Sequence, residues 1–189
     1  MPTLEAAFYA RSAREVARAL VGTVLRSDID GETVTGRIVE TEAYIGPHDP
    51  ASHAAERHGR TARNASMFGP PGIAYVYRSY GVHWCLNVVT DRLDFPAAVL
   101  IRAVEPLQGL DVMARRRGTG RRDLTRGPGR LTQAFGITGE LDGHPLDRPP
   151  LTLHPAPAAD DGDDGCPVEP VPGHLLASDR LLDTPGRAA

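Results

Sequence analysis

The sequence predicts an α+β fold: a single domain in which a mixed, mostly antiparallel and curved β-sheet is surrounded by helices. Two observations favour this fold class. The chain has 189 residues, of which 41% are hydrophobic, and that is enough for one sizeable core. Segments with strand character are joined by tight turns, so that consecutive strands pair as antiparallel hairpins, and the helical segments between them are short.

The first helix is marked by a capping box. Ser12 is the expected N-cap and Glu15 is its acidic partner, and apolar residues follow at helical spacing until Gly22. A hairpin comes next, because the turn dipeptide Asp30-Gly31 separates two segments with strand character. The two strands are expected over residues 24–29 and 32–45.

The middle of the chain alternates between loops, strands and helices. Residues 46–72 are expected to form a long ordered loop with short helical turns, and such a loop in a compact domain is often functional. The pattern then predicts two strands around Tyr80-Gly81, a buried strand ended by Glu105-Pro106, a helix with a basic end, and a basic loop. Their ranges are 73–79, 82–90, 97–104, 107–117 and 118–129. A short helix starting at Pro128 carries Phe135.

Composition separates a domain, residues 1–154, from a C-terminal tail, residues 155–189. Ala, Pro, Asp and Gly dominate the first part of the tail, which is typical of a flexible segment. Residues 1–139 hold 18 arginines against 14 acidic residues, whereas residues 140–189 hold 3 arginines against 10 acidic residues. A nucleic-acid-binding surface would therefore belong to the first part of the chain.

Several classes of protein are disfavoured by composition. No run of 18 apolar residues occurs, and the N-terminal segment lacks the apolar core of a secretory signal. Cys85 and Cys166 suggest neither a disulfide framework nor a metal site, so a reducing, cytoplasmic setting is expected. The spacing of one His and Asp cluster fits neither an HExxH helix nor a zinc finger, so no metal and no other cofactor is expected. This cluster consists of His48, Asp49, His53 and His58.

Two charged residues, Glu42 and Arg102, lie in strands that are otherwise apolar or β-branched. An ionised side chain in a buried strand is costly unless it is paired. The two residues are therefore either a structural ion pair or a carboxylate and a guanidinium that orient a water molecule. Glu40 could be the structural partner of Arg102 instead. Strand alternation places Glu40, Glu42 and Tyr44 on one face.

Five of the ten aromatic residues cluster along one part of the chain. They either pack in the core or form a stacking box for a flat base. Tyr80 is the best candidate for an exposed ring, because the tip of a turn is not a core position. The five are Tyr44, Tyr75, Tyr77, Tyr80 and Trp84.

A run of arginines follows the expected helix over residues 107–117. It is either a solvated helix face or a patch that contacts phosphates, and its one-sided charge favours the patch. The run comprises Arg115, Arg116, Arg117, Arg121, Arg122, Arg126 and Arg130. A second patch is expected at Arg57, Arg60 and Arg63.

Four blocks of sequence, in order over about three quarters of the chain, resemble the alkyladenine DNA glycosylase family, the mammalian type of 3-methyladenine DNA glycosylase that also occurs in bacteria. The blocks are RIVETEAYIGPHDPASH at 37–53, RTARNASMFGPPGIAYVYRSYGVHWCLNVV at 60–89, AVLIRAVEPLQG at 98–109 and GPGRLTQAFGI at 127–137. The resemblance implies a fold similar to the formyltransferase C-terminal-domain-like fold. It also implies base-excision repair: hydrolysis of the N-glycosidic bond of alkylated or deaminated purines in double-stranded DNA, which leaves an abasic site.

The resemblance implies a role for individual residues of this sequence. Glu42 would activate the attacking water with Arg102 beside it, and Tyr80 would intercalate where the nucleotide is flipped out. The base would lie among Tyr44, His53, Tyr77 and Asn87. The chain contains no lysine, so a monofunctional enzyme is expected. The backbone contacts are expected from Arg63, Arg115, Arg116 and Arg130, and a monomer is the simpler expectation.

Two alternatives remain open at the level of sequence. Members of that family usually end with an Arg-hydrophobic-Gly strand and a Trp-Arg-Phe-like segment, and residues 155–189 show neither. A catalytically impaired protein that binds damaged DNA is therefore the first alternative. The second is a metal-dependent hydrolase that uses the cluster around His53.

Overall fold

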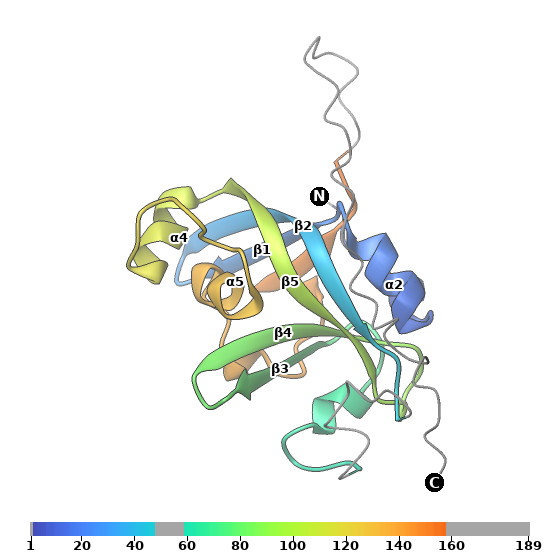
Figure 1. Ribbon diagram of the computed structural model, residues 1–189. Coiled ribbons are helices and arrows are strands. Elements are labelled where there is room, and N and C mark those ends of the chain that lie inside the picture. The colour runs from blue at the N-terminus through green and yellow to red at the C-terminus, as the bar shows by residue number, and fades with distance from the viewer. Residues whose placement is uncertain (1, 48–58, 158–189) are drawn as a thin grey trace, which may run out of the picture.

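The computed structural model describes residues 2–47 and 59–157, and these form one curled, seven-stranded sheet with helices around it (Figure 1). The strand order is β3-β4-β5-β2-β1-β7-β6. All six pairings between neighbours are antiparallel, so the described sheet has none of the parallel pairs that a mixed sheet would contain. The expectation of a single α+β domain is confirmed.

The elements have the following bounds. The strands are β1 Val24–Ile29, β2 Glu32–Tyr44, β3 Ala74–Ser79, β4 His83–Thr90, β5 Ala97–Gln108, β6 Asp147–Arg148 and β7 Leu151–His154. The helices are α1 Ala6–Tyr9, α2 Ala13–Leu20, α4 Leu110–Arg117 and α5 Pro128–Phe135, with 3-10 helices η1 Ala65–Phe68 and η2 Gly139–Leu141. No helix in the described part of the chain is long and apolar enough to cross a membrane.

Local signals in the sequence set the first elements and both tight hairpins. Ser12 caps α2, since its hydroxyl accepts from the backbone N–H of Glu15 while the Glu15 carboxylate accepts from the backbone N–H of Ser12. The β1–β2 turn has positive φ at Asp30 (57°) and Gly31 (73°). Two consecutive positive φ angles define the turn type that matches the twist of paired strands, and Asn, Asp and Gly favour it.

The main core lies on one face of the sheet and is shared by α2, α4 and α5. In Figure 1, α2 lies to the right of β2 and β5, and α4 and α5 lie to their left. Each helix contributes fully buried apolar residues to this core, and alternate residues of the strands meet them. Examples are Leu20 of α2, Met113 of α4 and Phe135 of α5. The opposite face carries a smaller cluster, which η1 covers with Met67.

The structure corrects two boundaries and adds two strands. β5 does not end at Glu105-Pro106 but continues to Gln108. Pro106 has no N–H to donate, and a β-strand tolerates this where its pairing is irregular. Pro106 pairs with Gly36 next to a register shift, which meets that condition.

Helix α4 begins at Leu110 rather than at 107, because Gly109 precedes it with φ of 79°. Strands β6 and β7 have no counterpart in the prediction.

Two further register shifts in the β2–β5 pair matter for the site. The register pairs Ile38 with Val104, then Glu40 with Ala103, then Thr41 with Ile101. Arg102 is thus the extra residue of a β-bulge opposite Glu40. Alternation along β5 places Arg102 on the same face as Ala98 and Leu100, and at the bulge its Nε lies 2.8 Å from Glu40 Oε1.

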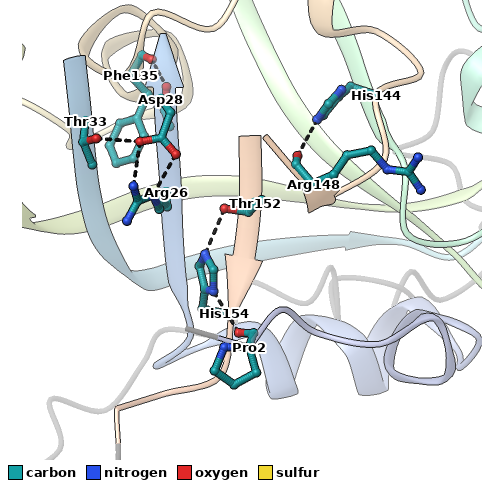
Figure 2. A network of polar contacts seen from close by, with 10 residues as sticks. Pro2, Arg26, Asp28, Thr33, Phe135, His144, Arg148, Thr152 and His154 are labelled. Atoms are coloured by element: carbon teal, nitrogen blue, oxygen red, sulfur yellow. Dashed lines mark hydrogen bonds and ion pairs between the residues drawn. The ribbon is translucent and has the colours of Figure 1, made fainter. Parts of the chain in front are cut away.

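β7 closes the far side of the sheet and ties down the N-terminal segment (Figure 2). His154 Nδ1 donates to the carbonyl oxygen of Pro2 at 2.8 Å, and Nε2 lies 2.9 Å from the hydroxyl of Thr152. On the adjacent strand, Asp28 accepts two hydrogen bonds from Arg26 and one from Thr33. Pro2 therefore lies beside the end of β7, whose neighbours in the sheet are β1 and β6.

Candidate active site

The register of four strands aligns the candidate residues on the face opposite the main core. One row runs across β2, β5, β4 and β3 and consists of Glu42, Leu100, Asn87 and Tyr75. A second row consists of Tyr44, Ala98 and Val89. A third pair, Cys85 and Tyr77, lies next to the first row toward the Tyr80 turn. The strands thus bring together residues that are up to about a third of the chain apart.

Arg102 joins two carboxylates at the centre of this face. Its Nη1 donates to Glu42 Oε2 at 2.6 Å, and its Nε donates to Glu40 Oε1 at 2.8 Å. Desolvation by burial lowers the pKa of the Arg102 guanidinium, but hydrogen bonds and attraction from both carboxylates outweigh it and raise the pKa overall. Glu42 keeps 25% of its side chain exposed, so a water molecule can reach the carboxylate.

Tyr44 lies beside Glu42 on the same strand face and hydrogen-bonds to its carboxylate. Burial raises the pKa of the Tyr44 phenol, and the negative charge of Glu42 raises it further. The phenol therefore stays protonated at neutral pH and is a hydrogen-bond donor. It packs against the small cluster of Tyr75, Met67, Val89 and Ala98.

Tyr75 and Tyr77 of β3 form the aromatic wall opposite β2. Their rings stack with centroids 5.4 Å apart and an interplanar angle of 30°. Burial raises the pKa of Tyr75 to about 12. Burial also raises the pKa of Tyr77, and a hydrogen bond with the thiol of Cys85 adds to the shift. Burial raises the pKa of the Cys85 thiol itself, which keeps the sulfur protonated.

Asn87 lies between the aromatic wall and Glu42 in the first row. It is 1% exposed, and its Nδ2 donates to the backbone oxygen of Tyr75 at 3.1 Å. That hydrogen bond fixes the orientation of the amide, so its other polar atoms are held in place on the site face.

Tyr80 lies at the tip of the β3–β4 hairpin, and its side chain is 98% exposed. It has φ of 49°, and Gly81 follows with φ of 69°. A bulky residue in the left-handed region is unusual. The turn therefore presents a large ring to solvent, at one end of the strand that carries Tyr77.

Of the four arginines expected to contact the DNA backbone, Arg63, Arg115 and Arg130 are exposed. Arg63 and Arg130 form no ion pair within the described residues. Arg63 donates to the backbone oxygen of Arg78 at 2.6 Å, next to the aromatic wall. Arg130 is exposed on α5, and no hydrogen bond or ion pair of its side chain occurs within the described residues. Gly129, the residue before Arg130, packs closely against His83. A Cβ added at Gly129 would lie only 2.8 Å from His83 Cβ. Arg130 therefore lies near the Tyr80 turn, since His83 pairs with Ser79 at that end of the hairpin.

The other two expected backbone contacts are engaged within the protein. Arg115 forms an ion pair with Glu32. Arg116 has only 13% of its side chain exposed, and its Nη2 donates to the backbone oxygen of Ile29 at 2.9 Å. Its Nη1 approaches the backbone oxygen of Ala134 at 3.5 Å. These contacts fasten α4 to the β1–β2 hairpin and to α5.

One expected site residue, His53, lies outside the described residues, as do His48, Asp49 and His58 of the cluster weighed as a metal site. Over residues 2–47 and 59–157, no three His, Cys, Asp or Glu side chains gather in a way that could hold a metal ion. The described site consists of carboxylates, a guanidinium, phenols and an amide.

Cys85 was not among the residues that the sequence singled out for this face. The alternation that places Asn87 on this face of β4 also places Cys85 there. Strand period alone could thus have found it. Only the register between strands shows that Cys85 lies on the same face as Glu42.

This arrangement suits hydrolysis of a bond next to a flat, electron-poor group. Glu42 is an oriented carboxylate that can take a proton from a water molecule. Aromatic rings on β2 and β3 can stack on a planar base, and stacking favours cationic or electron-poor rings.

Comparison with known proteins agrees with this chemistry. A profile of the family described as methylpurine-DNA glycosylase (MPG) matches residues 7–165. A protein of Rhodopseudomonas palustris (strain BisB18) is 53% identical over 154 residues, covering 81% of this chain and 74% of its own length. One of Nitrosospira multiformis is 47% identical over 183 residues, covering 95% of this chain and 86% of its own length. Both are provisionally named 3-methyladenine DNA glycosylase.

Proposed function

Because the chain belongs to the methylpurine-DNA glycosylase family, we propose that it excises alkylated purines such as 3-methyladenine from DNA by hydrolysing the N-glycosidic bond. The observation that carries the proposal is the pair formed by Glu42 and Arg102. The carboxylate is held at 2.6 Å by a guanidinium and is flanked by Tyr44, on the face where two further tyrosines stack.

In the proposed reaction, Glu42 takes a proton from a water molecule as the oxygen attacks C1′ of the sugar. The bond between C1′ and the purine nitrogen breaks, and the base leaves with the bonding electron pair. A purine alkylated on a ring nitrogen carries positive charge, so it is already a good leaving group. The protein therefore needs to supply chiefly a positioned water and a base. Arg102 fixes the carboxylate in the orientation that this step requires.

The aromatic residues supply the recognition of the base. Tyr44 would stack on one side of the flipped base and Tyr77 on the other, with His53 beside Tyr77. The amide of Asn87, held by the backbone of Tyr75, would reject guanine by crowding its exocyclic amine. We extend the substrates to deaminated purines, since a flat uncharged base can use the same stacking surfaces.

Tyr80 is the proposed wedge that fills the space left by the flipped nucleotide in double-stranded DNA. A fully exposed ring at a hairpin tip can enter the base stack without rearrangement of the core. Arg63 and Arg130 would contact the phosphate backbone on either side. The enzyme would work as a monomer without a cofactor. It would leave an abasic site, because the chain has no lysine for Schiff-base chemistry.

The test is excision from duplex oligonucleotides that contain one hypoxanthine or one ethenoadenine, followed by alkaline cleavage of abasic sites. Glu42→Gln should lower the single-turnover rate by about 100-fold or more, which is the usual contribution of a general base. Glu105→Gln is the matched control, because Glu105 lies on β5, the strand that pairs with β2, and forms an exposed ion pair with Arg37 at 3.8 Å.

Binding distinguishes the remaining outcomes. The Glu42→Gln variant should still bind the lesion duplex, since no stacking residue is changed. Tight binding by the wild-type protein without any alkali-dependent cleavage would instead show a protein that only recognises damage. Turnover that needs an added metal ion and is insensitive to Glu42→Gln would contradict the proposed mechanism.

A further inference from the structure

The structure divides the arginine run that follows β5 into two parts with different partners. The side chains of the first part have close partners within the protein. Arg115 pairs with Glu32, and Arg116 with backbone oxygens of β1 and α5. Arg117 donates to Gln133 at 2.5 Å, and Arg121 pairs with Asp111 at 2.7 Å.

The second part consists of Arg122, Arg126 and Arg130, and its charges are nearly unused. All three residues are exposed, and Arg126 has 82% of its side chain in solvent. Its one acidic neighbour is Asp123, at 3.6 Å, and that side chain is itself 54% exposed. An ion pair so open to solvent is weak and is easily exchanged for a phosphate.

The position of Arg126 follows from the end of the β4–β5 pairing. β4 pairs with β5 only as far as Leu100, and beyond that residue the loop before α5 lies along β5 instead. Arg126 forms an antiparallel bridge with Ala103, and the backbone N–H of Gly127 donates to the backbone oxygen of Arg102 at 3.1 Å.

The register also fixes the face from which Arg126 projects. Bridged residues on antiparallel strands have their side chains on the same face. Ala103 is paired with Glu40 on one side and with Arg126 on the other. Arg126 therefore projects from the face that carries Glu40 and Glu42 of β2 and Arg102 of β5.

We propose that Arg126 binds a phosphate of the DNA strand that delivers its nucleotide to Glu42. This inference rests on the proposed function, and it names a backbone contact on the same face as Glu42, across β5 from the strand that carries it. The site itself carries two carboxylates against one guanidinium, so a strand that approaches it meets net negative charge. An exposed arginine at the rim offsets that repulsion and places the phosphate by a charge-assisted hydrogen bond.

The test is the salt dependence of binding to a duplex with a single tetrahydrofuran abasic-site analogue, which cannot be cleaved by a glycosylase. Each phosphate contact contributes about 0.9 to the slope of log Kobs against log[salt]. Arg126→Ala should lower that slope by about one and weaken binding several-fold at low salt, and Arg126→Lys should restore most of the slope. Arg121→Ala is the matched control, because it removes another exposed arginine of the same run, whose partner Asp111 belongs to α4.

The acidic neighbours provide a second matched pair. Asp123→Asn should tighten binding, because it frees Arg126, and asparagine tolerates the φ of 53° at this position. Asp111→Asn beside Arg121 should have a smaller effect. Equal slopes for Arg126→Ala and the wild type, or an equal loss in Arg121→Ala, would overturn the inference. These binding measurements do not depend on excision. A wild-type protein that lacks glycosylase activity would therefore refute the proposed function, whereas the salt slopes decide the Arg126 contact separately.

Discussion

At the scale of single residues, the site depends on how one guanidinium is shared. Arg102 bonds to Glu40 through Nε and to Glu42 through Nη1, so the two carboxylates occupy different edges of the same planar group. Glu40 fixes the rotation of that plane. Glu40 is therefore a positioning residue that acts on Glu42 through Arg102.

Replacing Glu40 with glutamine should lower the rate of excision without a comparable loss of DNA binding. The amide keeps one acceptor oxygen but loses its charge, so Arg102 is held less firmly and Glu42 samples other orientations. Misplacement of a reacting group by an ångström or less costs about 10- to 100-fold in rate. Single-turnover kinetics on a hypoxanthine duplex measure the effect, and binding to the abasic-site analogue serves as the control. Wild-type kinetics in Glu40→Gln would show that Arg102 needs only one carboxylate.

The residues at the centre of the site were predictable from the sequence, whereas the use of the arginines was not. Alternation along one strand places Glu40, Glu42 and Tyr44 on a single face, and the structure shows them there. The arginine run reads as one basic patch, yet the fold uses Arg115 and Arg116 to join α4 to other elements. Which charges are neutralised depends on long-range pairing, which a local pattern does not contain.

At the scale of secondary-structure elements, the β3–β4 hairpin carries a strained turn. Its first turn residue is a tyrosine with φ of 49°, a conformation that asparagine or glycine adopts at lower cost. The ring is almost fully exposed, so no packing against the core offsets this conformational cost. A residue that is unfavourable for the fold and contacts no core suggests selection for function.

Tyr80→Asn should therefore separate stability from function. The free energy of unfolding should stay the same or rise by up to about 1 kcal/mol, because the left-handed conformation is less strained for asparagine. Affinity for a duplex with an extrahelical or abasic site should fall about tenfold or more, since the wedge is lost. Thermal unfolding and binding titrations measure the two quantities, and Leu107→Asn, at the far end of β5, is a control for loss of an exposed apolar side chain. A variant that is less stable but binds normally would contradict both expectations.

Elements were predictable wherever a local signal marks them. The capping box of α2 and the Asp30-Gly31 turn are such signals, and both form as expected. β5 passes through Pro106 because the irregular pairing with Gly36 tolerates a missing donor, and that condition depends on the partner strand. β6 and β7 are short, and Pro149 and Pro150 lie between them. Neither strand is long enough to show a clear alternation of apolar and polar residues.

At the scale of the whole molecule, the sheet separates a half that carries the candidate site from a supporting half. β2, β3, β4 and β5 carry the site residues on one face, whereas β1, β6 and β7 carry none of them. Both halves share the main core, in which Leu153 of β7 and Ile101 of β5 are each fully buried. Leu153 also accepts a backbone hydrogen bond from Leu4, so β7 holds the N-terminal segment as well.

This division predicts that damage to β7 lowers stability but spares the chemistry. Leu153→Ala should cost about 2–5 kcal/mol of unfolding free energy, as expected for a large-to-small change in a packed core. Each kcal/mol corresponds to about 2–4 °C in Tm for a domain of this size. Because one core serves both halves, far-UV circular dichroism and excision activity should be lost in the same transition. Well below that transition, the single-turnover rate should equal that of the wild type, since no residue near Glu42 has changed. Loss of activity at temperatures where the dichroism is still native would show instead that β7 and the site are coupled through the sheet.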